Sequence, residues 1–285
     1  MPSPEVLSAL TTPFDAAGEI DYAAFEANVR RLEPLVDGVF VAGTTGEYLA
    51  LETDEHARLA AICLEVFGAP RVVVHVGAAS TRQSVRLTEQ AKRLGAVRFA
   101  AITPYYLAAS TAGVLRHWAS IKEVCDGELY GYVFPDVAVT DVLPDALPEL
   151  LASGISGIKV SATASGRVDE YLAAAPEGFK LWSGNDADVP NVMAAGGTGT
   201  VSGVSCAVPL PWAALRDAMA AGDQEAAEKA QAIIARVVPV LGPSIANLKV
   251  ALDKQGFTGG ACRMVIDSPT PETLTQIDEV VALAN

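Results

Sequence analysis

The stretch Ile155-Ser156-Gly157-Ile158-Lys159-Val160 is a largely apolar run that contains a single lysine. A short apolar run of this kind is typical of a strand buried on both faces of a parallel sheet. Helical patterns flank it, near Leu143–Ala152 on one side and near Val168–Ala175 on the other. We therefore interpret the stretch as the strand of one strand–helix unit.

The same unit repeats along most of the chain, where β-rich runs alternate with amphipathic segments. The predicted strands are Val6–Thr11, Gly38–Ala42, Arg71–Val76, Arg98–Ile102, Leu129–Phe134, Gly154–Val160, Phe179–Trp182 and Thr200–Val204. An open doubly wound sheet is the alternative, but the turn after the first strand, Thr11–Asp15, lacks the glycine-rich pattern of a dinucleotide-binding sheet. We expect an α/β protein with a (β/α)8 TIM-barrel fold.

Helical patterns fill the gaps between these strands and continue after the last one. Between the strands they also lie near Tyr22–Leu35, Asp54–Phe67, Thr81–Leu94, Thr111–Val124, Val189–Ala195 and Pro211–Ala221. Three more follow without an intervening strand, near Asp223–Leu241, Ser244–Gln255 and Pro271–Leu283. We expect a barrel domain over residues 1–221 and a C-terminal helical region over residues 222–285, which either covers a barrel face or contacts another subunit.

Composition and charge limit the classes of partner. Apolar residues make up 51% of the chain and charged residues 19%, which argues against long disordered segments. A net charge of -14 without a basic run argues against nucleic acid, but it does not exclude a small anionic substrate. The first residues do not resemble a signal peptide and no window resembles a membrane span, so we expect a cytoplasmic protein with no membrane partner.

The cysteines and histidines do not form the spacing of a metal site, so we expect no zinc or other metal. His75 falls inside a predicted strand and is expected to be a hydrogen-bonded core residue. His56 and His117 fall in predicted helices and are expected to be exposed. The cysteines are expected to be small buried residues at Cys63, Cys125, Cys206 and Cys262.

Lys159 is the main candidate for a catalytic residue. Desolvation at a strand end disfavours the charged ammonium, and a neutral amine is a nucleophile for carbonyl carbon, so this position favours Schiff-base chemistry. The structural alternative is a lysine whose amine reaches water or pairs with a carboxylate. This stretch alone leaves both interpretations open.

Other strand ends add to the first interpretation, because active sites of such barrels lie at the C-terminal ends of the strands. The second strand ends in Gly43-Thr44-Thr45-Gly46-Glu47, which is suited to hold a carboxylate, although an ordinary strand-to-helix turn also explains it. Glu47 is expected to cap the next helix or to pair with a base. Tyr132, one strand before Lys159, is either a proton shuttle for an imine or a packing residue.

Together these motifs resemble the dihydrodipicolinate synthase / N-acetylneuraminate lyase family over nearly the whole chain. The resembling segments are Leu10–Asp15, Gly43–Glu47, Thr103–Tyr106, Tyr132–Pro135, Gly157–Lys159 and Ser183–Asp186. The resemblance implies a homo-oligomer, a dimer or commonly a tetramer. It also implies an imine between a lysine and pyruvate or a related 2-keto acid, with no metal or other cofactor.

Roles for single catalytic residues are also implied by the resemblance. Lys159 would be the Schiff-base nucleophile and Tyr132 the proton shuttle. Thr44 would link Tyr132 to a second tyrosine, Tyr106, which in this family reaches a neighbouring subunit.

The resemblance implies a substrate-binding set as well. The amides of Thr44 and Thr45 and the Thr45 hydroxyl, in the turn that begins at Gly43, would hold the keto-acid carboxylate. The backbone of Gly184 would face the substrate, and Val201 would line the pocket.

The end of the fifth strand and the segment after it depart from the family's synthases. They carry Asn where this chain has Val133, and an Arg shortly after the proline, where this chain has Asp136 and no basic residue. An acid at that position would repel the carboxylate of aspartate semialdehyde. We therefore expect a Schiff-base lyase or aldolase that acts on pyruvate and on a 2-keto acid, such as a 2-keto-3-deoxy sugar acid or one with a neutral or hydrophobic tail. The alternatives are a dehydratase that uses the same imine, a dihydrodipicolinate synthase, and a barrel that binds a keto acid without turnover.

Overall fold

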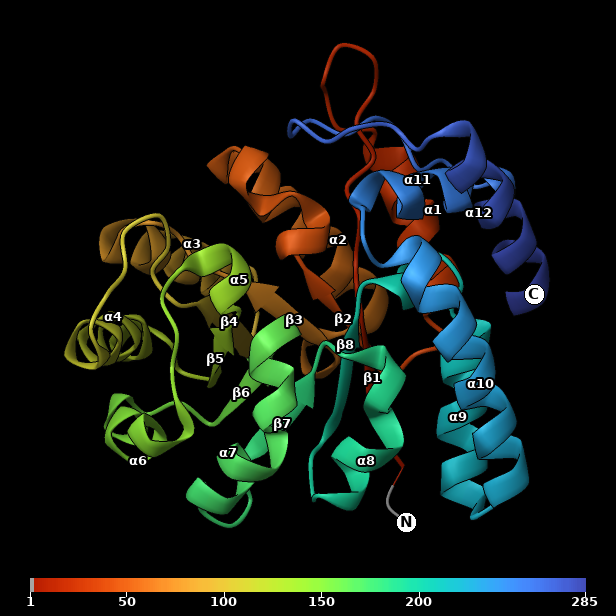
Figure 1. Ribbon diagram of the computed structural model, residues 1–285. Coiled ribbons are helices and arrows are strands. Elements are labelled where there is room, and N and C mark those ends of the chain that lie inside the picture. The colour runs from red at the N-terminus through yellow and green to blue at the C-terminus, as the bar shows by residue number, and fades with distance from the viewer. Residues whose placement is uncertain (1–2) are drawn as a thin grey trace.

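Eight parallel strands close into a barrel in sequence order, and helices surround it (Figure 1). The computed structural model describes residues 3–285, so the first two residues of the predicted barrel domain lie outside it. The strands are β1 (Glu5–Ala9), β2 (Gly38–Val41), β3 (Val72–His75), β4 (Arg98–Ile102), β5 (Glu128–Val133), β6 (Gly157–Val160), β7 (Lys180–Ser183) and β8 (Gly199–Ser202). β8 pairs with β1, with Val201 opposite Leu7, and this pairing completes the closure. The predicted TIM barrel is confirmed.

Most of the predicted helices are present. The helices are α1 (Tyr22–Leu32), α2 (Thr53–Phe67), α3 (Thr81–Arg93), α4 (Thr111–Val124), α5 (Pro135–Ala138), α6 (Leu147–Leu150), α7 (Val168–Ala174), α8 (Val189–Ala194), α9 (Leu210–Ala221), α10 (Gln224–Leu241), α11 (Ile245–Lys254) and α12 (Pro271–Ala284). The single helix predicted over Leu143–Ala152 is wrong. This segment instead forms the short helix α6 with a 3₁₀ turn on either side, because Pro144 and Pro148 lack the amide donors that a continuous helix uses. The short α5, which begins at Pro135, has no counterpart among the predicted helices.

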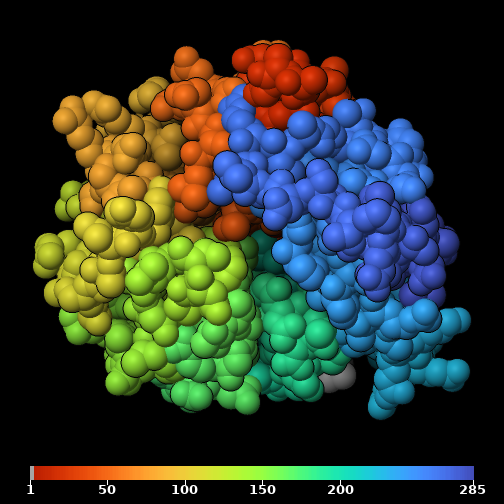
Figure 2. All heavy atoms as spheres, turned by 45° about the horizontal axis from the view of Figure 1, so that its top comes forward, coloured from red at the N-terminus to blue at the C-terminus, as the bar shows by residue number. Residues whose placement is uncertain are grey.

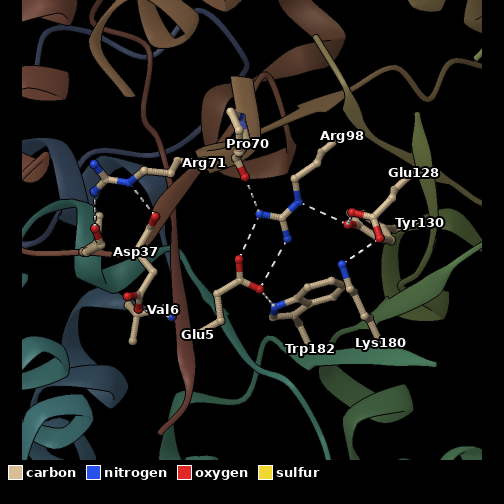
Figure 3. Close-up of polar contacts among 11 residues, drawn as sticks. Glu5, Val6, Asp37, Pro70, Arg71, Arg98, Glu128, Tyr130, Lys180 and Trp182 are labelled. Atoms are coloured by element: carbon tan, nitrogen blue, oxygen red, sulfur yellow. Dashed lines mark hydrogen bonds and ion pairs between the residues drawn. The ribbon is translucent and has the colours of Figure 1, made fainter. Parts of the chain in front are cut away.

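Charged residues close the N-terminal end of the barrel (Figure 3). Arg98 Nη1 lies 2.8 Å from Glu5 Oε1, and the Trp182 ring nitrogen donates to the same carboxylate over 2.9 Å. Lys180 Nζ lies 2.6 Å from Glu128 Oε1. Because strands β1, β4, β5 and β7 each begin with one of these charged residues, the pairs fill that end of the barrel. Space for a ligand is therefore left at the other end, where the strands finish.

The C-terminal helices pack beside the barrel and extend to its open end. α10 packs against α9 and α12, and α11 packs against α12 (Figure 1). Residues of α10 and α11 line the cavity at the strand ends, so this region covers part of a barrel face, one of the two arrangements that the sequence leaves open. Among the described residues no single helix is long and apolar enough to span a membrane, and α10 and α11 pass that test only as a pair bent by 114°.

The prediction that His56 and His117 are exposed is wrong, because they are 4% and 3% exposed. His56 Nε2 lies 2.7 Å from the His75 carbonyl oxygen, and His117 Nδ1 lies 2.9 Å from Thr81 Oγ1. Both follow the apolar spacing of their helices: His56 precedes the buried Leu59 by three residues. The core position of His75 is confirmed by a hydrogen-bond contact of 2.9 Å between its Nδ1 and the Ala42 carbonyl oxygen. Of the cysteines, Cys63, Cys125 and Cys206 are buried and Cys262 is half-buried.

Candidate active site

A cavity of about 790 Å³ opens at the C-terminal ends of the strands. The space-filling view shows a recess near the middle of this face, bordered by the green central segments and the blue C-terminal segments (Figure 2). Six of the predicted site residues line it, namely Thr44, Thr45, Tyr132, Lys159, Gly184 and Val201. The structure therefore brings together residues that come from five different strand ends.

Lys159 lies in β6 directly opposite Tyr132 of β5, as the strand register requires. Its side chain is almost fully buried, and Nζ lies 4.1 Å from the centroid of the Tyr132 ring and 4.7 Å from that of Phe40. No carboxylate of residues 3–285 lies within ion-pair distance of this amine. The salt bridge, one of the two structural alternatives for the lysine, is therefore wrong, and the amine faces the cavity instead.

The predicted relay is only partly assembled within one chain. Thr44 Oγ1 and the Tyr132 hydroxyl lie 3.3 Å apart, close enough for a hydrogen bond in either direction. Tyr106 is 87% exposed, and its hydroxyl makes no hydrogen bond with Thr44 or with another residue of the described part of the chain. Its backbone has φ 73°, an uncommon left-handed conformation for a tyrosine.

The turn after β2 presents free backbone donors. Residues Thr44–Gly46 form a 3₁₀ turn in which the amides of Gly46 and Glu47 donate to the carbonyls of Gly43 and Thr44. The amides of Thr44 and Thr45 precede these bonds and are not used by the turn. Gly43 does not line the cavity itself, and a Cβ there would lie 2.7 Å from the Phe40 ring, so close packing explains this glycine.

The turns after β7 and β8 are built with equally close contacts. A Cβ at Gly203, which follows β8, would lie 3.0 Å from Thr45 Oγ1. One at Gly184, which follows β7, would lie 2.5 Å from Ser161 Oγ. These glycines therefore set the space around the Thr45 and Ser161 hydroxyls. Ser161 was not among the predicted site residues, although its place directly after the lysine strand was a signal for it.

Asp186 is a second lining residue that has no predicted role. Its Oδ1 accepts hydrogen bonds from Thr200 Oγ1 and from the Trp212 ring nitrogen, both at 2.9 Å, and its Oδ2 accepts one from Ser202 Oγ at 2.7 Å. Burial raises the pKa of this carboxyl above its usual range. An acidic residue just after a buried strand was the sequence signal for a site residue here. Its three hydrogen-bond donors lie on β8 and α9, so the sequence around Asp186 does not reveal them.

The segment after β5 lacks a free cation, as the sequence indicates. Asp136 accepts hydrogen bonds from the Thr163 hydroxyl at 2.8 Å and the Thr163 amide at 3.1 Å, and these bonds hold its pKa below the usual range. Arg167, on the segment after β6, pairs with both carboxylate oxygens of Asp141. Neither Asp136 nor Arg167 lines the cavity.

Known proteins match this chain over nearly its whole length. The sequence model of the dihydrodipicolinate synthetase family matches residues 2–283. A 4-hydroxy-tetrahydrodipicolinate synthase from Mesorhizobium japonicum is 31% identical over 281 residues, which cover 95% of each chain. Dihydrodipicolinate synthase from Thermotoga maritima has a solved structure with a TM-score of 0.91 at 27% identity, and the match covers 100% of this chain and 99% of that one.

A sialic acid aldolase from Ruminococcus gnavus shares the fold. Its structure, a catalytic lysine mutant, has a TM-score of 0.89 at 20% identity, and the match covers 98% of this chain and 94% of that one. The family model and the whole-length sequence similarity together place the chain: it belongs to the dihydrodipicolinate synthetase family and is a lyase of that family.

Proposed function

We propose that the protein is a Schiff-base-forming lyase of the class I aldolase type, which acts on pyruvate and on a longer 2-keto acid. The observation that carries the proposal is the Lys159 amine, which is buried without a counterion at 4.1 Å from the centroid of the Tyr132 ring. A neutral amine attacks a carbonyl carbon, and the protonated imine that results is an electron sink for the bond that breaks next. In this proposal the covalent imine takes the place of a bound cofactor.

Substrate binding and proton transfer are assigned to the neighbouring residues. The Thr44 and Thr45 amides and the Thr45 hydroxyl hold the carboxylate of the keto acid, so that its C2 carbonyl faces Lys159. Nζ adds to C2, and the Tyr132 hydroxyl gives the proton with which the carbinolamine oxygen leaves as water. Thr44, 3.3 Å from that hydroxyl, orients it.

A second substrate other than aspartate semialdehyde is part of the proposal. Val133 ends β5 and Asp136 follows it in α5, a segment with no basic residue, while Arg167, after β6, is paired with Asp141. Neither segment therefore offers a free cation for a second carboxylate. Keto-deoxy sugar acids and other 2-keto acids without a charged tail remain as substrates. A pyruvate-release assay with such acids tests cleavage, and loss of water without cleavage would identify a dehydratase instead.

The first experiment is intact-protein mass spectrometry after incubation with pyruvate and borohydride. We expect one reduced pyruvyl adduct in the parent protein and none in Lys159→Ala. Lys180→Ala is the matched control, because Lys180 lies on the neighbouring strand but at the closed end of the barrel, and it should form the adduct. No adduct in the parent with pyruvate or other 2-keto acids would overturn the proposal. An adduct without turnover of any substrate would identify a keto-acid-binding barrel.

A further inference from the structure

The cavity has a polar base and an apolar wall. Around Lys159 the strand ends supply the base with hydrogen-bonding side chains, namely Thr44, Thr45, Tyr132, Ser161 and Asn185. The wall comes from α5, α10, α11 and the segment before α12, and its side chains are Val137, Val238, Pro239, Ile245, Leu248 and Ile266. Hydrogen-bonding groups therefore surround the amine, and hydrocarbon surrounds the space beyond it.

One hydroxyl, that of Ser244, lies beside the wall, and the fold uses it as an acceptor but not as a donor. Ser244 precedes α11, and its Oγ accepts a hydrogen bond of 3.2 Å from the Ala246 amide as the cap of that helix. A substrate hydroxyl placed against the wall would lose its hydrogen bonds to water and would face Val, Ile, Leu and Pro side chains instead. The wall is therefore a poor surface for a polyhydroxylated tail.

The wall also lacks charge. Of the described residues that line the cavity, only Lys159 and Asp186 have charged side chains, and the Asp186 oxygens already accept three hydrogen bonds. Asp136, outside the cavity on the same short helix as Val137, would repel an anion. A carboxylate on the substrate tail would thus be desolvated without a counterion.

We infer that the substrate's tail, the part beyond C4 of the keto acid, is apolar, so that cleavage releases pyruvate and an aldehyde with an aromatic or branched aliphatic substituent. This inference rests on the proposed function and adds the chemical class of the second product. It also narrows that function, because it disfavours keto-deoxy sugar acids. Val137 and Ile266 become specificity residues, since they bring hydrocarbon to the cavity from α5 and from the segment before α12.

The cleavage step balances without an oxidant or reductant. Tyr132, left as a phenolate after imine formation, takes the proton of the C4 hydroxyl. The C3–C4 bond breaks, its electron pair flows to the imine nitrogen, and C4 leaves as a neutral aldehyde. The enamine that remains takes this proton back from Tyr132 at C3. Water then adds to C2 and gives a proton to Tyr132, which releases pyruvate and restores the Lys159 amine.

The test compares three substrates with the same 4-hydroxy-2-oxo acid core. They are 4-hydroxy-2-oxo-4-phenylbutanoate, 2-keto-3-deoxygluconate and 4-hydroxy-2-oxoglutarate, and pyruvate release is followed with lactate dehydrogenase. We expect the kcat/KM of the phenyl compound to exceed both others by about 10-fold or more, the size of effect that apolar pocket contacts produce. A preference for either polar tail, or cleavage of none of the three while the borohydride adduct still forms, would overturn the inference.

Variants of the wall connect the preference to its residues. Val137→Ser and Ile266→Ser should each lower kcat/KM for the phenyl compound about 10-fold, mainly through KM, and leave the pyruvate adduct unchanged. Val265→Ser is the matched control, because Val265 is the neighbour of Ile266 but is fully exposed and does not line the cavity. Equal behaviour of Ile266→Ser and Val265→Ser would contradict the assignment. Failure of adduct formation in the parent would instead refute the proposed function itself.

Discussion

Lys249 and Glu47 form a buried ion pair in which Nζ lies 2.6 Å from Oε1. Glu47 directly follows the Thr44–Gly46 turn, and Lys249 lies on α11. The other oxygen of Glu47 accepts hydrogen bonds from the amides of Arg263 and Met264 over 2.8 and 2.7 Å. The prediction that Glu47 pairs with a base is confirmed. The pair joins the rim of the barrel to the C-terminal region.

Lys249→Met is expected to lower the free energy of unfolding by about 3–5 kcal/mol, because it leaves the Glu47 charge buried without a partner. Guanidinium denaturation followed by circular dichroism measures this change in the free energy of unfolding. The control is Lys254→Met on the same helix, whose pair with Asp278 is largely exposed and should contribute less than about 1 kcal/mol. Similar losses of unfolding free energy in the two variants would show that the buried pair stabilises the protein no more than the exposed one.

Tyr132→Phe is expected to lower kcat by about 10²–10⁴-fold, because the hydroxyl would no longer transfer protons at the imine. Thr44→Val should lower kcat by a smaller factor, since it removes only the group that orients the Tyr132 hydroxyl. Steady-state pyruvate release measures both. Tyr105→Phe is the control, because that tyrosine does not line this cavity. Unchanged kcat in Tyr132→Phe would make Tyr132 a packing residue after all.

Acid should destabilise the protein partly through His117. Burial lowers its pKa to about 4, compared with about 6.5 in an unfolded chain. Because the folded state binds this proton less readily than the unfolded chain, the free energy of unfolding is unaffected by His117 above about pH 6.5. It falls by up to about 3 kcal/mol as the pH drops to about 4. His117→Gln should therefore lose less stability than the parent between about pH 7 and pH 4. Denaturation curves at both pH values measure this difference, and parallel losses in the two proteins would contradict it.

The periodicity of the chain was enough to predict the barrel, because each strand is buried on both faces and is visible as an apolar run. It could not predict the division of Leu143–Ala152, where two prolines override the helical pattern. Lys159 and Tyr132 could be predicted for the site because each stands out within one segment. Asp186 could not be given a role, because its hydrogen-bond donors lie on β8 and α9 and meet it only in the folded chain.

Tyr106 is the predicted catalytic residue that one chain alone does not bring into the site, and it stands exposed beside Leu107, which is 75% exposed. We expect these side chains to be covered in a homo-oligomer, where Tyr106 of one subunit reaches Thr44 of another. Specific activity should then fall as the protein is diluted from dimers to monomers. Mixing Tyr106→Phe with Lys159→Ala sharpens the test, because in mixed dimers one site combines an intact Lys159 with an intact Tyr106. Up to about a quarter of the parent activity should return on mixing, as expected for random two-fold dimers. Monomers with full activity, or no recovery on mixing despite confirmed subunit exchange, would show that Tyr106 does not act across an interface.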